Sequence, residues 1–308
     1  MHRIGFVVSP DFQLMSVAAL PAFEFANLTT PTPFYDVQVL SETGGPVRSS
    51  LGLVMETASL DGGTWDTVIF GGDLDGSDVS ESMVAAVQRA SGAARRTASI
   101  CTGAFVLAQA GLLDGRSVTT HWAQARELAA RYPTIKLDSD RIFTVDGPIW
   151  TSAGASAGID LALGMIENDL GPEIARLVAR KLVLHHRRAG GQSQHSVLLE
   201  MDAKSDRIQT ALDYARNNLT AELSVEDLAE AAHLSPRQFS RAFRAETGQS
   251  PAKAVENLRV EAARLMMEQT RHPIEVIADQ TGFADRERMR RAFIRAYGQP
   301  PQAIRRSA

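Results

Sequence analysis

The sequence predicts an α/β domain with a doubly wound parallel sheet, followed by an all-helical domain with two helix-turn-helix units. In roughly the first 165 residues, short β-branched segments alternate with helical segments, which is typical of a parallel sheet with helices on both faces. Beyond about residue 206 only helical patterns occur, and one of them is repeated. The repeat indicates two copies of one supersecondary unit.

The elements of the first domain follow in order along the chain. The expected strands are Ile4–Val8, Tyr35–Leu40, a hairpin or strand pair in Pro46–Glu56, Trp65–Phe70, Thr97–Ile100, Ser117–Thr120, and the pair Arg141–Val145 and Ile149–Ser152. The expected helices are Gln13–Leu28, Val79–Gly92, a segment ending at Ala110, Ala155–Asn168, and one from Pro172 to about His185–Arg188. In such sheets, ligands bind at the carboxyl ends of the strands.

The domain boundary is predicted in a polar, glycine-rich stretch. We expect one domain at 1–190, a linker at 191–205 and the helical domain at 206–308. Residues 1–200 hold 15 Lys and Arg against 21 Asp and Glu, whereas residues 201–308 hold 17 against 15. The basic excess lies in the helical part, as expected if only that part contacts phosphates.

Cysteine content and hydropathy indicate the cellular compartment of the protein. Cys101 is the single cysteine, so no intrachain disulfide can form and a reducing compartment is expected. No run approaches the 18 or so apolar residues of a membrane-spanning helix, and the N-terminal apolar run ends too early for a signal peptide. We expect a cytoplasmic protein without a membrane partner.

The repeat in the helical part has a defined offset. Arg241-Ala-Phe and Gly248-Gln recur as Arg291-Ala-Phe and Gly298-Gln, 50 residues later, and Val225–Ala229 matches Ile274–Ala278 at an offset of 49. Each copy has a short amphipathic helix, a tight turn and a second helix. The expected helices are Val225–Ala232 and Pro236–Thr247 in the first copy, and Ile274–Thr281 and Arg286–Tyr297 in the second, with the Gly282-Phe283 turn.

The second helix of each copy has the features of a recognition helix. Ser235 and Gln238 form an expected capping box around Pro236, and a sharp helix start can present its first turn to a major groove. The expected DNA-binding residues are Ser235, Arg237, Gln238, Arg241, Arg244, Arg286, Arg288, Arg290, Arg291 and Arg295. Phe239, Phe243, Met289 and Phe293 lie at helical spacing and are expected in the core.

The segment between the copies sets their separation. Pro251–Glu268 is predicted as one helix about 27 Å long, close to the roughly 34 Å of one DNA turn. A solvated basic face is the alternative interpretation of the arginines. The duplication, cap, turn and spacing together favour DNA binding.

This region resembles the AraC/XylS family of transcription regulators over about 100 residues. The matching stretches are Leu228–Phe243, Thr247–Pro251 and Ile277–Phe283. The resemblance implies control of transcription on promoter DNA as a homodimer, with RNA polymerase as a further partner.

The motif around Cys101 suggests a second site. Cys101-Thr102-Gly103 follows an expected strand and opens a helix. A strand-to-helix elbow exposes a nucleophile, and a helix N-terminus favours the thiolate. His121 follows a strand-like segment and could approach the thiol, while Gly71-Gly72 could donate backbone N–H groups to an oxyanion.

This part resembles the PfpI branch of the class I glutamine-amidotransferase-like superfamily, over roughly residues 1–170. The matching stretches are Gly71–Asp73, Ile100–Gly115, Thr119–Trp122 and Thr151–Asp160. The resemblance implies a flavodoxin-like sheet, and the domain order is that of GlxA-type regulators. Isonitrile hydratases of this branch place an acid in the segment matching Gln13–Val17, where this chain has Ser16.

Without that carboxylate, Cys101 and His121 lack the third group of a catalytic triad. We therefore expect no catalysis. His185, His186 and His195 form no metal-ligand pattern with Cys101, so we expect no metal, and we expect no cofactor. We expect instead a pocket for a small-molecule effector, for which a cation is one candidate. Its expected lining is Asp11, Phe12, Ser16, Gly72, Cys101, Thr102, His121 and Trp122. Two alternatives remain: an isonitrile hydratase or amidase fused to a DNA-binding domain, and a ligand-independent DNA-binding protein with a dimerisation domain.

Overall fold

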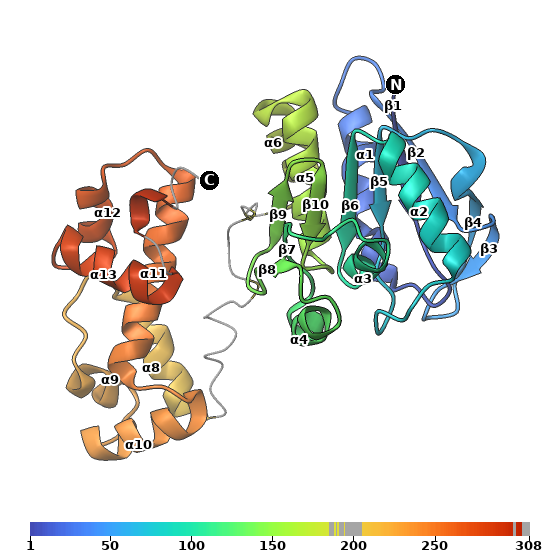
Figure 1. Ribbon diagram of the computed structural model, residues 1–308. Helices are drawn as coiled ribbons and strands as arrows, with labels where there is room; N and C mark the ends of the chain where they lie inside the picture. Colours follow the sequence, from blue (N-terminus) through green and yellow to red (C-terminus); the bar gives the residue numbers. More distant parts are fainter. Residues whose placement is uncertain (185–187, 189, 191–193, 195–204, 298–299, 304–308) are drawn as a thin grey trace. The chain divides into compact units, whose positions relative to one another are not determined.

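The computed structural model describes residues 1–184, 188, 190, 194, 205–297 and 300–303 (Figure 1). The chain divides into two units, Met1–Gln194 and His195–Ala308. Apart from Gln194 and Ser205, the predicted linker at 191–205 lies outside the described residues.

An eight-stranded sheet forms the centre of the first unit, in the order β3-β4-β2-β1-β5-β6-β10-β9. The strands are β1 His2–Val7, β2 Tyr35–Ser41, β3 Gly45–Arg48, β4 Val54–Ser59, β5 Thr67–Phe70, β6 Arg96–Ile100, β9 Phe143–Asp146 and β10 Ile149–Ser152. The strands from β4 to β10 pair in parallel, and β3 and β9 are antiparallel edge strands. The crossover order confirms the predicted doubly wound α/β fold.

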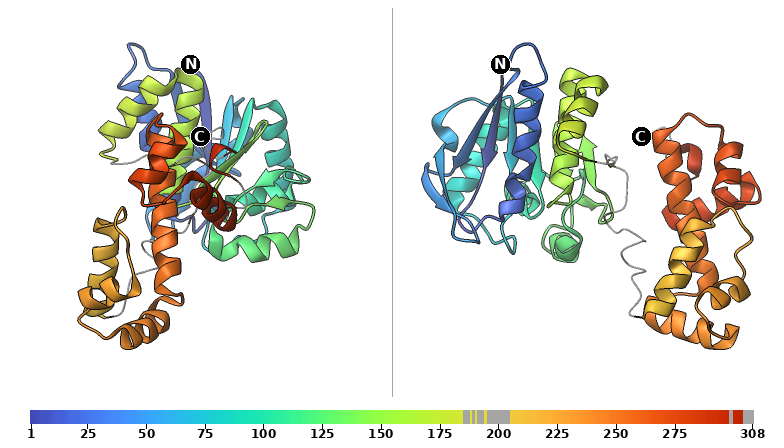
Figure 2. Two further views of the ribbon diagram at one scale, coloured as in Figure 1. Left: turned by 90° about the vertical axis from the view of Figure 1, so that its left-hand side faces the viewer. Right: turned by 180° about the vertical axis from the view of Figure 1, so that it is seen from behind.

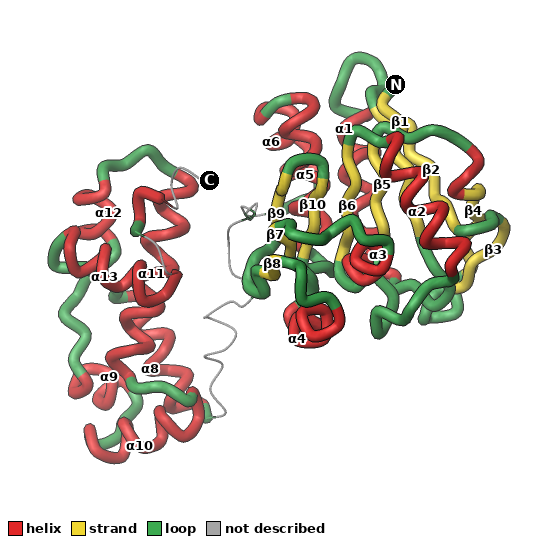
Figure 3. Tube along the Cα trace, viewed as in Figure 1, coloured by secondary structure: helices red, strands yellow, loops and turns green. Residues whose placement is uncertain are grey.

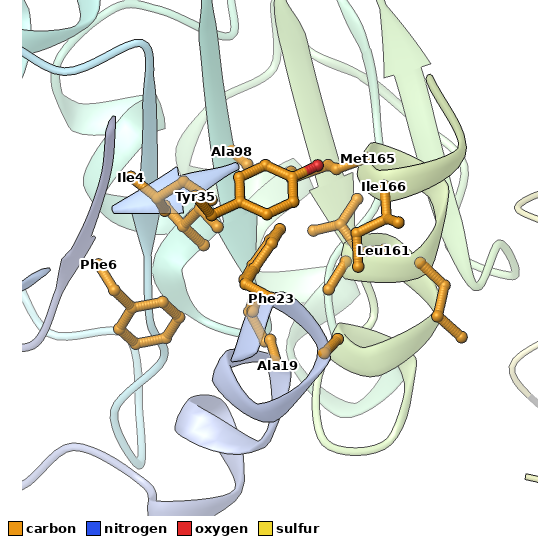
Figure 4. Close-up of a cluster of buried hydrophobic side chains, with 14 of the residues drawn as sticks. Ile4, Phe6, Ala19, Phe23, Tyr35, Ala98, Leu161, Met165 and Ile166 are labelled. Carbon is orange, nitrogen blue, oxygen red and sulfur yellow. The ribbon is translucent and has the colours of Figure 1, made fainter. Parts of the chain in front are cut away.

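Helices cover both faces of this sheet (Figure 3). Their bounds are α1 Leu20–Asn27, α2 Glu81–Ala93, α3 Gly103–Gln109, α4 Trp122–Arg131, α5 Ala157–Leu170 and α6 Pro172–Lys181. One core lies between the sheet and α1, α5 and α6, where Phe6, Phe23 and Leu161 pack together (Figure 4). A second core on the opposite face includes Phe70, Val87 and Leu107. Because helices cover both faces of the sheet, every residue of the central strands β5 and β6 is buried.

Three predicted elements differ from the structure. The expected helix Gln13–Leu28 is a 3-10 turn, Leu14–Ala19, followed by α1, because Pro21 lies at the start of the α-helix. The strand expected at Ser117–Thr120 is short: β7, Ser117–Val118, pairs with β8, Lys136–Leu137, outside the main sheet. The helix from Pro172 ends at Lys181, and Val183 then adopts a left-handed φ of 57°. The predicted end near His185–Arg188 lies outside the described residues, except for Arg188.

A buried ionic cluster joins the amino ends of the strands to α5. The Asp169 side chain is 1% exposed and accepts hydrogen bonds from Arg96, Arg95 and the Tyr35 hydroxyl. Arg96 is itself buried and stacks on the Trp150 ring, 4.8 Å from its centroid. Burial alone would raise the pKa of Asp169, but the two guanidinium groups outweigh it and hold the pKa below the usual value.

The second unit is helical and confirms the predicted pair of helix-turn-helix units. Its helices are α8 Asp206–Asn217, α9 Val225–Ala231, α10 Pro236–Thr247, α11 Pro251–Gln269, α12 Ile274–Gln280 and α13 Arg286–Tyr297. The long helix α11 runs between the two groups of helices (Figure 2). The predicted core residues Phe239, Phe243, Met289 and Phe293 are buried. They belong to two separate clusters, one for each helix-turn-helix unit.

Candidate functional site

Helix α10 has a fixed start. The Ser235 hydroxyl accepts a hydrogen bond from the Gln238 N–H, and the Gln238 side chain accepts one from the Ser235 N–H. Pro236 occupies the first helical position, and Gly248 ends the helix in a left-handed conformation. The capping box predicted from the sequence is therefore present. It holds the first turn of α10 in one geometry, with Ser235 and Gln238 exposed.

The basic residues of α10 are exposed and unengaged. Arg237, Arg241 and Arg244 all lie on the solvent side of the helix. Within the described part of the chain, their guanidinium groups form no ion pair with a carboxylate. Three uncompensated positive charges on one helix attract phosphates.

The arginines of α13 are also exposed, but most are paired with carboxylates. Arg286 binds Glu275 at 3.0 Å, Arg290 binds Glu287 at 2.8 Å, Arg288 lies 3.9 Å from Asp285, and Arg295 binds Glu256 of α11. Among these five, only Arg291 has no described carboxylate partner. Exposed ion pairs contribute little to stability, because water screens them, so phosphates can compete for these arginines.

A groove of ≈ 660 Å³ runs between the two helix-turn-helix units. Arg288, Arg291 and Arg295 of α13 line one side, and Arg259 of α11 lies in its wall with Glu256. Three of the five arginines of the second recognition helix therefore share one concave surface.

In the first unit, Cys101 lies at the predicted elbow between β6 and α3. Its φ is 58°, a left-handed value that is uncommon for a residue with a side chain. The elbow is closed, however, and Cys101 is only 5% exposed. Gly72 and Gly154 press on it so tightly that a Cβ at either would lie 2.9 or 2.3 Å from the Cys101 Cβ.

Burial changes the chemistry of the thiol. Desolvation and the nearby Asp73 charge raise the pKa of Cys101, and hydrogen bonds from Thr102 only partly offset this. The helix N-terminus was expected to favour the thiolate. The structure reverses this expectation, because desolvation outweighs the N-terminal donors.

The backbone donors expected for an oxyanion are already engaged. The Gly71 N–H donates to the Val7 carbonyl at 2.9 Å. The Gly72 N–H donates to the Ser16 hydroxyl at 3.1 Å, and that hydroxyl donates back to the Gly72 carbonyl at 3.0 Å. Ser16 is 1% exposed, so it serves as a structural clamp on Gly72.

The other predicted pocket residues differ in exposure and in their contacts. Phe12 is buried in the core, whereas Asp11 is exposed. The His121 Nδ1 caps α4 by accepting from the Ala123 N–H at 3.3 Å, and its ring packs against Trp122, which is 54% exposed. No hydrogen bond between His121 and Cys101 occurs in the described part of the chain.

A cavity of ≈ 410 Å³ lies at the carboxyl ends of β1, β2 and β5, beside the elbow. Its lining includes Ser9, Ser41, Glu42, Asp73 and Asp78, and does not include Cys101. The Asp73 carbonyl accepts a hydrogen bond from the Thr102 hydroxyl at 3.0 Å. Asp73 thus connects the cavity to the elbow.

Known proteins resemble both the domain that contains Cys101 and the helix-turn-helix part of this chain. Residues 7–168 match the DJ-1/PfpI family, and residues 228–307 match a helix-turn-helix domain. The HTH-type transcriptional regulator GlxA of Rhizobium meliloti is 33% identical over 314 residues, which cover 99% of this chain and 96% of GlxA. The chain belongs to the AraC-type helix-turn-helix regulators with a DJ-1/PfpI domain. It is a DNA-binding transcriptional regulator.

The regulator is also similar to proteins that match only part of its chain. Isonitrile hydratase of Pseudomonas putida is 32% identical over 184 residues, covering 58% of this chain and 77% of the hydratase. A crystal structure of an AraC family transcriptional regulator from Pseudomonas putida covers 59% of this chain and all of its own, with a TM-score of 0.53 and 23% identity. The latter supports the fold of one unit of the regulator.

Sequence reasoning missed one contact near the candidate pocket. The Gln194 side-chain amide donates to the Thr120 carbonyl at 2.8 Å and accepts from the Trp122 N–H at 2.9 Å. Thr120 in turn donates to the Cys101 carbonyl. Gln194 therefore ties the end of the first unit to the elbow of the regulator, through partners so distant in sequence that no local motif marks them.

No described helix is long and apolar enough to cross a membrane. The described residues also contain no group of three or more His, Cys, Asp or Glu arranged to hold a metal ion.

Proposed function

We propose that the protein controls transcription by inserting the first turns of α10 and α13 into DNA major grooves. The observation that carries this assignment is the capped start of α10, with exposed Arg237 and Arg241 that no described carboxylate neutralises. The paired arginines of α13 contribute through exchange of carboxylates for phosphates. Binding to a promoter as a homodimer in the cytoplasm, with contact to RNA polymerase, completes this proposal.

A paired substitution tests the DNA-binding assignment. Arg241→Ala is expected to weaken binding to a selected DNA site by about 10-fold, because it removes an uncompensated contact. Arg290→Ala removes an arginine already paired with Glu287 and is expected to have a clearly smaller effect. Affinities are measured at one fixed salt concentration. Unchanged affinity for the Arg241 variant would contradict the assignment.

We further propose that the first unit binds a small-molecule effector near Cys101 without catalysing its conversion. The engaged Gly72 N–H and the raised pKa of Cys101 support binding over nucleophilic attack. The cavity beside Asp73 supplies the volume, and a bound effector would alter DNA affinity through coupling between two sites.

The similarity to isonitrile hydratase supports one rival. An enzyme would hydrate isonitriles or hydrolyse amides in a reaction that Cys101→Ala abolishes while DNA binding is retained. We expect no such turnover from the wild-type protein. Detected turnover that depends on Cys101 would replace the sensing proposal.

A further inference from the structure

Arg259 joins the two helix-turn-helix units at the middle of α11. Its guanidinium group donates to the Leu219 carbonyl at 3.0 Å and to the Ala221 carbonyl at 2.7 Å. Both carbonyls lie in the loop between α8 and α9, on the side of the first helix-turn-helix copy. Partial burial lowers the pKa of Arg259, but an arginine stays protonated in proteins. The planar group can therefore hold both carbonyls at once.

Gly282, in the turn between α12 and α13, reaches the same loop from the other side. A Cβ at Gly282 would lie 1.8 Å from the Leu219 carbonyl oxygen and 2.7 Å from the Arg259 Nε. Both neighbours are fixed by their mutual hydrogen bond. The turn of the second helix-turn-helix unit therefore packs backbone to backbone on the first.

The first copy of the repeat shows why this position is glycine. At the offset of 49, Gly282 corresponds to His233, which adopts a φ of 51°, against 78° for Gly282. The left-handed turn thus accepts a side chain in the first copy. Glycine is required in the second copy because the Leu219 carbonyl leaves no space for a Cβ.

Each helix-turn-helix copy has its own hydrophobic cluster, so the contact between Arg259, Leu219 and Gly282 joins two separate cores. On α11, Leu258 belongs to the cluster of the first copy and Val260 to that of the second, with Arg259 between them. Without the contact, the copies would be joined through α11, on which Glu256 also pairs with Arg295 of α13. A bend of 10° at the middle of this 19-residue helix moves one end by roughly 2–3 Å relative to the other half, because half its length is about 14 Å. Contacts to base edges require much finer placement.

We propose that Arg259, the Leu219 carbonyl and Gly282 form an interlock that fixes α10 and α13 relative to each other, so that the protein recognises its two DNA segments at one spacing. This inference rests on the proposed DNA contacts of both helices. Arg259 is a positioning residue here and does not itself read a base.

The full-length protein and a DNA site selected from random sequence provide the test. Wild-type protein is expected to lose about 10-fold or more in affinity when one base pair is inserted between the two contacted segments. Gly282→Ala is expected to bind the original site about 10-fold more weakly and to discriminate the two spacings by less than about threefold. Gly248→Ala is the matched control, because Gly248 has a φ of 74° but no atom within 4 Å of its Cβ position. It should retain the wild-type spacing preference.

Arg259→Met keeps the test valid if Gly282→Ala fails to fold, as judged by circular dichroism. It should also lose the spacing preference, while the slope of log affinity against log salt stays at the wild-type value. Arg259→Lys, which keeps one donor to the loop, should be intermediate. A slope lowered by about 0.9 would mean that Arg259 contacts a phosphate directly and would overturn the positioning role.

Wild-type spacing preference in both the Gly282 and the Arg259 variants would overturn the interlock. If Arg241→Ala still weakens binding in that case, the proposed DNA contacts stand and only the interlock fails. If Arg241→Ala has no effect, the proposed function itself is wrong.

Discussion

Cys101 has the backbone conformation of a nucleophile at an elbow, but its thiol is buried and therefore not placed to react. Its φ of 58° matches a strained elbow, a feature that the strand, cysteine, threonine and glycine pattern predicted correctly. Its burial was not predictable, because it depends on Gly72 and Gly154, which come from other strands and close on the thiol only in the folded chain. The engagement of the Gly72 N–H by Ser16 was equally hidden, since the two residues are 56 positions apart.

The raised pKa of Cys101 predicts how the thiol reacts with pH. Only the thiolate is alkylated, so iodoacetamide should label the folded protein very slowly at pH 7.5. The rate should rise only above the usual thiol pKa of about 8.5. Mass spectrometry of the labelled chain measures this rate, and labelling in denaturant is the control. Fast labelling at pH 7.5 in the native protein would show an accessible thiolate and would favour the enzyme hypothesis.

At the scale of elements, periodicity gave reliable positions. The predicted bounds of α10 and α13 coincide with the structure, because a cap residue or a turn marks each start. The pairing of their arginines with carboxylates was less predictable. The pairing of Arg290 with Glu287 is local, but Arg295 pairs with Glu256, 39 residues away on α11. Sequence spacing identifies exposed arginines, but not those that the fold neutralises.

The ionic cluster around Asp169 links α5 to β6 and β2, and it predicts a dependence of stability on pH. Asp169→Asn leaves Arg96 buried without its charge partner and should destabilise the protein by about 3 kcal/mol at pH 7. Because the pKa of Asp169 is lowered in the folded state, its contribution is present above about pH 4 and lost as the pH falls through the lowered pKa. The variant should therefore lose less stability on acidification than the wild type.

Differential scanning calorimetry at pH 7 and pH 3.5 measures this difference. Asp61→Asn is the control, since Asp61 forms an exposed pair with Arg89, and it should change stability far less than Asp169→Asn does. Equal destabilisation by both substitutions would contradict a special role for the buried cluster.

At the scale of the whole molecule, the alternation of strands and helices was sufficient to predict the doubly wound sheet and the helical second part. The domain bounds at 190 and 206 remain a prediction. The four largest hydrophobic clusters nevertheless lie within single units: one on each side of the sheet, and one in each helix-turn-helix copy. The copies were recognisable from their repeat, whereas the interlock between them was not, because it uses backbone carbonyls that carry no sequence signal.

Separate cores predict that residues 206–308 fold and bind DNA alone. The fragment should recognise the same site as the full chain, but more weakly if dimerisation resides in the first unit. Footprinting of the fragment and the full chain on the same DNA compares their specificity. Loss of specificity in the fragment would show that the predicted boundary or the modular interpretation is wrong.

The exposed Trp122 gives the protein an internal optical reporter. All three tryptophans lie in the first unit, and the other two, Trp65 and Trp150, are 4% and 9% exposed. An aqueous quencher such as iodide should therefore reach Trp122 selectively. Because Trp122 packs on His121 and its backbone bonds to Gln194, its emission comes from the segment that joins the elbow to the end of the first unit. Changes in that emission would report effector binding on unlabelled protein, and the helical unit, which lacks tryptophan, would add no background.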